Sequence, residues 1–185
     1  MTESVGSLAL ICGPMWAGKS TELLRRVRRH SVTHGKVAVI THAKDVRFGP
    51  EMALATHDAA IFHAIAAKHL GDEEVVRAVA MSDVVAVDEG QFFDDLAPMC
   101  NKWADAGKIV IVSALDATFE RKPFANVTEL CPDTVDKLTA VCFHCKRDAP
   151  FTRRTSGETA VEVVGAKDKY EAVCRACYVE KRQVD

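Results

Sequence analysis

Several features that would place this chain in a special class of protein are missing from its sequence. No apolar run approaches the roughly 18 residues that a membrane-spanning helix needs. The polar opening stretch MTESVGS lacks the charged and apolar segments of a secretory signal. The net charge is only −2, which gives no general attraction to nucleic acid or to an anionic membrane. We therefore expect a cytoplasmic protein with neither a membrane nor a nucleic-acid partner.

The chain has enough apolar residues for one well-packed domain and a small addition. It has 185 residues, of which 48% are hydrophobic. Stretches typical of buried strands alternate with stretches typical of helices, and this alternation predicts an α/β fold with a mostly parallel sheet flanked by helices. The expected strands cover residues 7–13, 36–43, 84–87 and 108–116, and the expected helices cover residues 20–30, 72–81 and 94–107. One more strand is expected over residues 137–142.

The stretch GPMWAGKS fits the phosphate-binding pattern G-x-x-x-x-G-K-[ST], the P-loop, between a predicted strand and a predicted helix. In such a loop, backbone N–H groups and the start of the helix surround phosphate oxygens. We expect Lys19 to hold the β- and γ-phosphates of ATP and the hydroxyl of Ser20 to bind Mg²⁺. A chance match at a strand-to-helix turn is the weaker alternative. The expected nucleotide-binding loop comprises Gly13, Pro14, Met15, Trp16, Ala17, Gly18, Lys19 and Ser20.

Two carboxylates, Asp88 and Glu89, follow the buried strand VVAV at residues 84–87. Open α/β sheets bind their ligands at the carboxyl ends of the strands. Asp88 is expected to join the Mg²⁺ shell, as an acid in this place does in P-loop proteins. Glu89 is then available as a general base, which activates either water in an ATPase or a substrate hydroxyl in a kinase. A plain acidic residue before the next helix is the third possibility, and these motifs alone leave the choice open.

Four of the seven cysteines form two C-x-x-C pairs, Cys142 with Cys145 and Cys174 with Cys177. In the cytoplasm, cysteines are seldom paired as disulfides, and four thiolates predict a closed, structural Zn²⁺ site. A redox pair is the weaker alternative. The polar segment at residues 146–173 is too hydrophilic to form its own core, so zinc would fix its two ends. The residues favour equally a lid over a small substrate and a zinc-ribbon interaction module.

Together these motifs closely resemble the cellular (type II) thymidine kinases. The matching stretches follow the family order over about residues 8–180, and they are GPMWAGKSTELLRRVRR, AKDVRF, DEGQFF, ALDATFERKPF, KLTAVCFHC and EVVGAKDKYEAVCRACY. The resemblance implies transfer of the ATP γ-phosphate to the 5′-OH of thymidine, and more weakly of deoxyuridine, in deoxynucleotide salvage. It also implies a P-loop α/β domain at residues 1–138 and a small zinc-ribbon domain with a lasso loop at residues 139–185, with thymidine between them.

The resemblance gives roles to residues around the phosphates. Glu89 matches the base that accepts the proton of the 5′-OH, and Ser20 and Asp88 match the Mg²⁺ partners. Arg47 is suited to offset charge on the transferring phosphoryl group, although an ion pair with a nearby acid is the structural alternative. Besides the loop, the nucleotide is expected to contact Asp45, Val46, Arg47, Asp88, Glu89, Gly90 and Gln91.

For the nucleoside, Phe119 and Tyr170 match substrate contacts of the family. A lasso strand is expected to read thymine through main-chain hydrogen bonds that cytosine would not satisfy, and it comprises Val161, Glu162, Val163, Val164 and Gly165. The base pocket is expected to be lined by Met15, Phe92, Leu115 and Thr152. Ordinary core packing is the alternative for Phe92 and Leu115. Trp16 departs from the phenylalanine common in the family, and the resemblance does not predict its effect.

The resemblance further implies a homotetramer and feedback inhibition by thymidine triphosphate (dTTP). The main alternative is a nucleic-acid-dependent P-loop ATPase in which the DEGQ stretch positions water and the zinc module holds nucleic acid. ATPases of that kind need two RecA-like domains, whereas 185 residues contain one. A non-catalytic zinc-ribbon adaptor is the third possibility, and it would leave the P-loop and Glu89 without a function.

Overall fold

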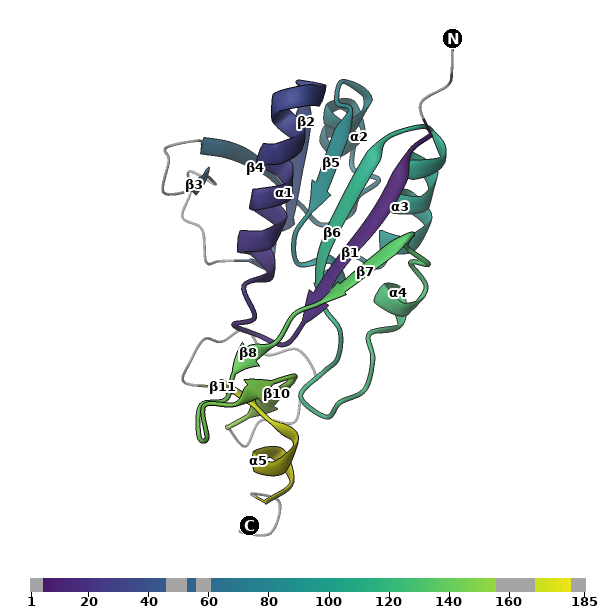
Figure 1. The fold of residues 1–185 in the computed structure, drawn as a ribbon. Helices are drawn as coiled ribbons and strands as arrows, with labels where there is room; N and C mark the ends of the chain where they lie inside the picture. The colour runs from purple at the N-terminus through teal and green to yellow at the C-terminus, as the bar shows by residue number, and fades with distance from the viewer. Residues whose placement is uncertain (1–4, 46–52, 56–60, 156–168, 181–185) are drawn as a thin grey trace.

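The computed structural model describes residues 5–45, 53–55, 61–155 and 169–180 (Figure 1). Its centre is a seven-stranded sheet in the order β3-β4-β2-β5-β6-β1-β7. All neighbouring strands run parallel except β3, which pairs antiparallel with β4 at one edge. The strands are β1 (Ser7–Gly13), β2 (Val37–His42), β3 (Ala53–Ala55), β4 (Ile61–Ala67), β5 (Val84–Val87), β6 (Ile109–Leu115) and β7 (Thr134–Lys137). The predicted mostly parallel α/β sheet is confirmed.

Helices cover both faces of this sheet (Figure 1). The helix α1 (Lys19–His34) packs on one face, while α2 (Glu73–Ala80) and α3 (Leu96–Asp105) pack on the other. In β5, Val84 and Ala86 belong to the apolar cluster with α1, whereas Val85 and Val87 belong to the cluster with α2 and α3. Because both faces are covered, every side chain of the strand is apolar, and the sequence shows no alternation.

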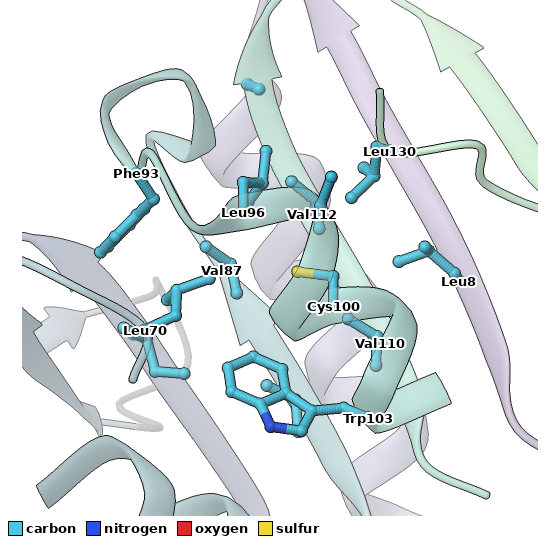
Figure 2. Packing of buried hydrophobic residues seen from close by; sticks show 14 of the residues in the cluster. Leu8, Leu70, Val87, Phe93, Leu96, Cys100, Trp103, Val110, Val112 and Leu130 are labelled. Carbon is cyan, nitrogen blue, oxygen red and sulfur yellow. The ribbon is translucent and has the colours of Figure 1, made fainter. Parts of the chain in front are cut away.

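The larger apolar cluster lies between the sheet and α3 (Figure 2). Leu96, Cys100 and Trp103 are spaced four and three residues apart, so they share one face of the helix. This face packs against strand residues that include Val110 and Val112. Burial of each large apolar side chain contributes about 1.5–3 kcal/mol, so this face fixes α3 on the sheet.

A smaller part of the chain lies at the carboxyl ends of β1 and β6 (Figure 1). Its strands are β8 (Ala140–Val141), β9 (Asp148–Ala149), β10 (Phe151–Arg154) and β11 (Tyr170–Val173), followed by α5 (Arg175–Glu180). They form two antiparallel pairs, β8 with β9 and β10 with β11. Their buried residues form a third apolar cluster. Within the described residues, no helix combines the length and the apolar character needed to cross a lipid bilayer.

Two expectations about secondary structure are wrong in this region. The strand expected over residues 137–142 is divided, because β7 ends at Lys137 in the large sheet and β8 begins at Ala140 in another. The helices expected from the sequence end at residue 107, yet α5 is a helix. With six residues, α5 is too short for a period to be recognised. The sequence analysis also missed β3, β4, the short helix α4 (Ala125–Thr128) and the 3₁₀ helix η1 (Gly90–Phe92).

Candidate active site

The predicted phosphate-binding loop connects β1 to α1. Gly13 ends β1 with a φ of 146°, and Gly18 precedes α1 with a φ of 81°. A Cβ atom at Gly13 would lie 2.4 Å from the carbonyl oxygen of Leu138, so only glycine fits there. Lys19 is buried, and its Nζ donates a hydrogen bond to the Pro14 carbonyl at 2.8 Å. The lysine head therefore lies across the loop, at the N-terminal end of a helix where an anion would be favoured.

Three carboxylates gather at the carboxyl ends of neighbouring strands. Asp45 follows β2, while Asp88 and Glu89 follow β5. Carboxylate oxygens of these three residues lie within 4.8 Å of one another. They meet because β2 and β5 are parallel neighbours in the sheet. Oxygen ligands of this kind suit Mg²⁺. The sequence analysis expected Asp88 in a metal shell but Asp45 only as a nucleotide contact.

The backbone at Glu89 is unusual for a residue with a side chain. Its φ is 55° and its ψ is 40°, in the left-handed region, which few residues other than glycine adopt. The Nε2 of Gln91 donates a hydrogen bond to Glu89 Oε2 at 2.5 Å, and the Oε1 of Gln91 accepts one from the Leu115 N–H at 2.9 Å. The Glu89 carboxylate is thereby fixed relative to the end of β6.

A second amide side chain, that of Asn126, also holds this turn. Asn126, in α4, directs its Nδ2 to the carbonyl oxygens of Gly90, Gln91 and Phe93, at 3.3, 3.1 and 2.9 Å. Backbone held in a sparsely populated region persists where its surroundings determine it strongly, as at functional sites. Asn126 is a residue that the sequence analysis missed, because nothing in the local pattern sets this asparagine apart.

The expected nucleoside contacts Phe119 and Tyr170 are joined through Arg154. The Cζ of Arg154 lies 3.9 Å from the ring centroid of Phe119 and 5.1 Å from that of Tyr170. Its Nη2 also donates a hydrogen bond to the Tyr170 hydroxyl at 2.6 Å. A guanidinium between two aromatic rings is a favourable arrangement. The sequence analysis missed Arg154 as well, since its two ring partners are remote in sequence.

The four expected base-pocket residues lie at the same edge of the sheet. Met15, Phe92 and Leu115 follow or end β1, β5 and β6, and each is half-buried. Thr152 belongs to β10 of the small part, and its Oγ1 accepts a hydrogen bond from the Met15 N–H at 3.0 Å. Phe92 lies 5.5 Å from the ring of the buried His42, centroid to centroid. The Met15–Thr152 hydrogen bond thus joins expected pocket residues from the two parts of the chain.

The four predicted zinc ligands form one cluster. The sulfur atoms of Cys142, Cys145, Cys174 and Cys177 lie within 4.8 Å of one another. A tetrahedral Zn²⁺ with Zn–S bonds of about 2.3 Å places its sulfurs about 3.8 Å apart, so this set fits zinc. A hydrogen bond from Arg147 Nε to Cys145 Sγ lowers the pKa of that thiol to about 6. Cys145 therefore forms the thiolate that a metal ligand requires near neutral pH.

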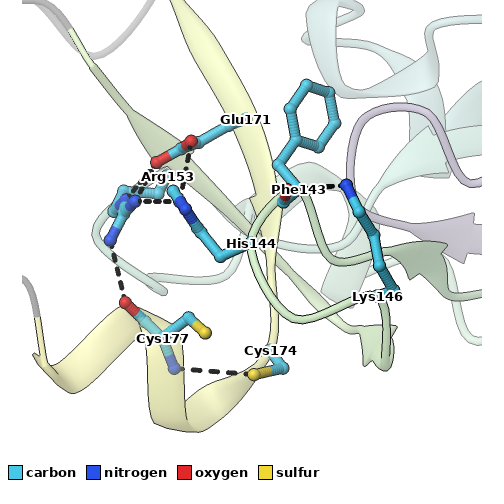
Figure 3. A network of polar contacts seen from close by, with 7 residues as sticks. All are labelled: Phe143, His144, Lys146, Arg153, Glu171, Cys174 and Cys177. Carbon is cyan, nitrogen blue, oxygen red and sulfur yellow. Dashed lines mark hydrogen bonds and ion pairs between the residues drawn. The ribbon is translucent and has the colours of Figure 1, made fainter.

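A polar network ties both C-x-x-C turns to one hairpin (Figure 3). Arg153 and Glu171 are paired across β10 and β11 and form an ion pair. His144 of the first turn contacts Glu171 at 3.0 Å, and Arg153 Nη1 donates to the Cys177 carbonyl of the second turn at 2.8 Å. Burial alone would raise the pKa of Glu171, but hydrogen bonds from Arg153 and His144 lower it. Glu171 therefore remains charged inside the network.

Comparisons with known proteins agree on one family. The family model described as "Thymidine kinase" matches residues 6–178. The chain belongs to the thymidine kinase family. The thymidine kinase of Variola virus is 47% identical over 177 residues, which cover 95% of this chain and 98% of the viral protein. The thymidine kinase of Vaccinia virus (strain Western Reserve) is 46% identical over 95% of this chain and 98% of its own length. That of Myxoma virus (strain Uriarra) is 45% identical over 94% of this chain and 96% of its own length.

Membership of the thymidine kinase family confirms the prediction of an ATP-dependent phosphotransferase over the ATPase and adaptor alternatives.

Not all of the expected site residues of this thymidine kinase homologue can be located. Val46, Arg47 and the lasso stretch at residues 161–165 lie outside the described residues. Ser20 is half-buried in the first turn of α1, and Gly90 and Gln91 are buried in η1.

Proposed function

We propose that the protein transfers the γ-phosphate of ATP to the 5′-OH of thymidine, with Glu89 as the general base. The observation that carries this proposal is the fixed Glu89 carboxylate at the carboxyl end of β5, held by Gln91. Because β1 and β5 are parallel strands of one sheet, the phosphate loop after β1 opens at the same edge. A carboxylate there can take the proton of an attacking hydroxyl as it approaches the γ-phosphate.

The loop from Gly13 to Ser20 would hold the ATP phosphates, with Lys19 on the β- and γ-phosphates and Arg47 near the transferring group. Ser20 and Asp88 would hold Mg²⁺, and the Asp45 carboxylate is close enough to Asp88 to join them. Bound Mg²⁺ neutralises phosphate charge during transfer. Further nucleotide contacts are proposed at Val46, Gly90 and Gln91.

Thymidine would bind between a P-loop domain at residues 1–138 and a zinc domain at residues 139–185. Two features support this position: the Met15–Thr152 hydrogen bond and the Phe119–Arg154–Tyr170 arrangement. The main chain of residues 161–165 would read the thymine edge. A methyl group in an apolar pocket is worth about 1–3 kcal/mol of discrimination, so deoxyuridine should be a weaker substrate. The rest of the pocket would be Met15, Phe92 and Leu115.

The test is Mg·ATP-dependent phosphoryl transfer to thymidine, deoxyuridine, deoxycytidine and thymidine monophosphate, with a control that lacks an acceptor. We expect product from thymidine and, more weakly, from deoxyuridine. The variant Glu89→Gln should lose about 10²–10⁴-fold in turnover while still binding thymidine in calorimetry. Asp94→Asn, an exposed acid of the same segment, is the matched control and should behave as the wild type. Near-normal turnover of Glu89→Gln would remove Glu89 as the base.

The remaining proposals concern the state of the enzyme in the cell. The four-cysteine cluster would hold a structural Zn²⁺, and the protein would act in deoxynucleotide salvage in the cytoplasm as a homotetramer. dTTP would inhibit it by spanning the nucleoside pocket and the phosphate loop, in competition with both substrates. Light scattering that gives a monomer would contradict the tetramer, and full activity at saturating dTTP would contradict the inhibition.

A further inference from the structure

We propose that Phe143, inside the first C-x-x-C turn, and Trp16, inside the phosphate loop, are positioning residues that hold this loop in the shape needed for nucleotide binding. The inference rests on the proposed function of the loop at residues 13–20. It adds a role for the small zinc domain in binding ATP, besides its proposed role in binding thymidine.

The first observation is the backbone of Trp16. Its φ is 62°, and a bulky residue in the left-handed region is a genuine outlier. Such a conformation persists only when the surroundings hold it. The ring of Trp16 lies 5.3 Å from that of Phe143, centroid to centroid, with an angle of 52° between their planes. This distance is within the range of favourable aromatic pairs, so Phe143 is a direct support for the strained residue.

The second observation is that two further contacts link the loop to the chain that follows β7. The Met15 N–H donates a hydrogen bond to Thr152 Oγ1 at 3.0 Å. At the start of the loop, Gly13 closely approaches the Leu138 carbonyl, and the Leu138 N–H donates to the Cys12 carbonyl at 2.8 Å. The loop is thus held at its start, at Met15 and at Trp16.

The third observation is how Phe143 itself is fixed (Figure 3). It lies between two zinc-ligand cysteines, its N–H donates to the Ala172 carbonyl at 3.0 Å, and its carbonyl accepts from Lys146 Nζ at 2.9 Å. Its backbone is therefore set by the zinc turn. Its side chain is 39% exposed, so the ring is no essential part of a core. Replacing it should leave the zinc turn folded and remove one of the contacts that support Trp16, which also packs against the third apolar cluster.

The effect on nucleotide binding depends on the fraction of molecules in which the loop has the shape that binds phosphate. A phosphate loop binds through several backbone N–H groups that must point to one anion at the same time. If the loop samples other shapes, the apparent affinity falls in proportion to the fraction that remains competent. Without the ring of Phe143, we expect the affinity for MgADP to fall about two- to tenfold, the size of an aromatic pair's contribution.

The experiment is calorimetric titration of MgADP into the full-length, zinc-loaded protein, with zinc content measured for every variant. Phe143→Ala should bind MgADP about two- to tenfold more weakly at unchanged zinc content, and Phe143→Tyr, which keeps the ring, should bind as the wild type does. Val141→Ala is the matched control, because Val141 is an exposed residue of the same segment. It should also bind as the wild type does.

Trp16→Ala removes the same aromatic contact by a substitution in the loop, outside the zinc turn. At unchanged zinc content, this variant decides the question if Phe143→Ala loses zinc. It should show a similar weakening. Wild-type affinity in Trp16→Ala, or in Phe143→Ala at full zinc content, would overturn the inference while leaving the proposed function intact. Absence of MgADP binding by the wild type would overturn the proposed function of the loop, and the inference with it.

Discussion

The turn that carries Glu89 is held by the side-chain amide of Asn126. A substitution of Asn126 therefore tests whether this amide positions Glu89 for the reaction. Asn126→Ala removes the donor that serves three carbonyl oxygens. A small misplacement of a reacting group can reduce the rate by up to about 10²-fold, so we expect turnover to fall about 10- to 100-fold with little change in the KM for ATP. Steady-state kinetics with thymidine would measure this change.

Asn101 offers a matched control for that variant. Its Nδ2 also donates to two backbone carbonyls, of Ala97 and Leu130, but it belongs to α3, away from the Glu89 turn. Asn101→Ala should therefore reduce stability without a specific loss of turnover. If both variants lose turnover in proportion to their loss of stability, the effect of Asn126 is structural and not one of positioning.

These contacts show which residues of the site a sequence can reveal. Gly13, Lys19 and Ser20 could be proposed from sequence because a phosphate loop is contiguous and needs fixed residue types at fixed spacing. Asn126 contacts a carbonyl 36 residues earlier in the chain. Arg154 contacts Phe119, which is equally remote in sequence. Contacts of this kind depend on the final fold, and an asparagine or arginine is common enough that its type alone carries no signal.

In the helix α1, Glu22 lies beside the first two arginines of the sequence RRVRR, and their contacts give a prediction about stability and pH. A hydrogen bond from Arg25, followed by one from Arg26, lowers the pKa of Glu22 to about 2. Since the folded pKa is below the ordinary value, the ion pairs stabilise the protein above pH about 4.5. Their contribution is lost as the pH falls toward 2.

Glu22→Gln should therefore reduce the free energy of unfolding at pH 7, by less than about 1 kcal/mol because the pairs lie near the surface. Urea denaturation at pH 7 and pH 3 would measure the difference from the wild type, which should shrink at the lower pH. Glu129→Gln, at an exposed acid that follows α4, should show no such difference. An equal difference at both pH values would show that Glu22 contributes through packing and not through charge.

The same contrast between local and distant information applies to strands and helices. The strand β5 was predictable because four consecutive buried apolar residues are typical of a central parallel strand. The division between β7 and β8 was not predictable, because Lys137 and Ala140 are only three residues apart and both strands are short. Leu138 lies between the two strands, and its carbonyl oxygen closely approaches Gly13.

The molecule as a whole combines a large core with a small one that depends on its cysteines. Among the described residues, the third apolar cluster has seven buried members, of which two are Cys142 and Cys174 of the proposed zinc site. A core of this size seldom folds without a metal or a disulfide. The spacing of the cysteines predicted that their four sulfur atoms gather in one cluster. The contact of their turn with the phosphate loop, through Phe143 and Trp16, was not predictable, since it joins residues from both ends of the chain.

Cys174→Ser should therefore release zinc and unfold the small part while the large sheet remains folded. The reason is that removing one ligand leaves three thiols, which bind zinc weakly, whereas the two apolar clusters of the large sheet contain none of the four zinc ligands. Limited proteolysis should cut the variant within residues 139–180 much faster than the wild type, and it should leave a resistant fragment that contains β1 to β7. Cys131→Ser, at an exposed cysteine outside the cluster, should keep both zinc and resistance. Loss of the large sheet at the same rate would instead mean that the two parts unfold as one cooperative unit.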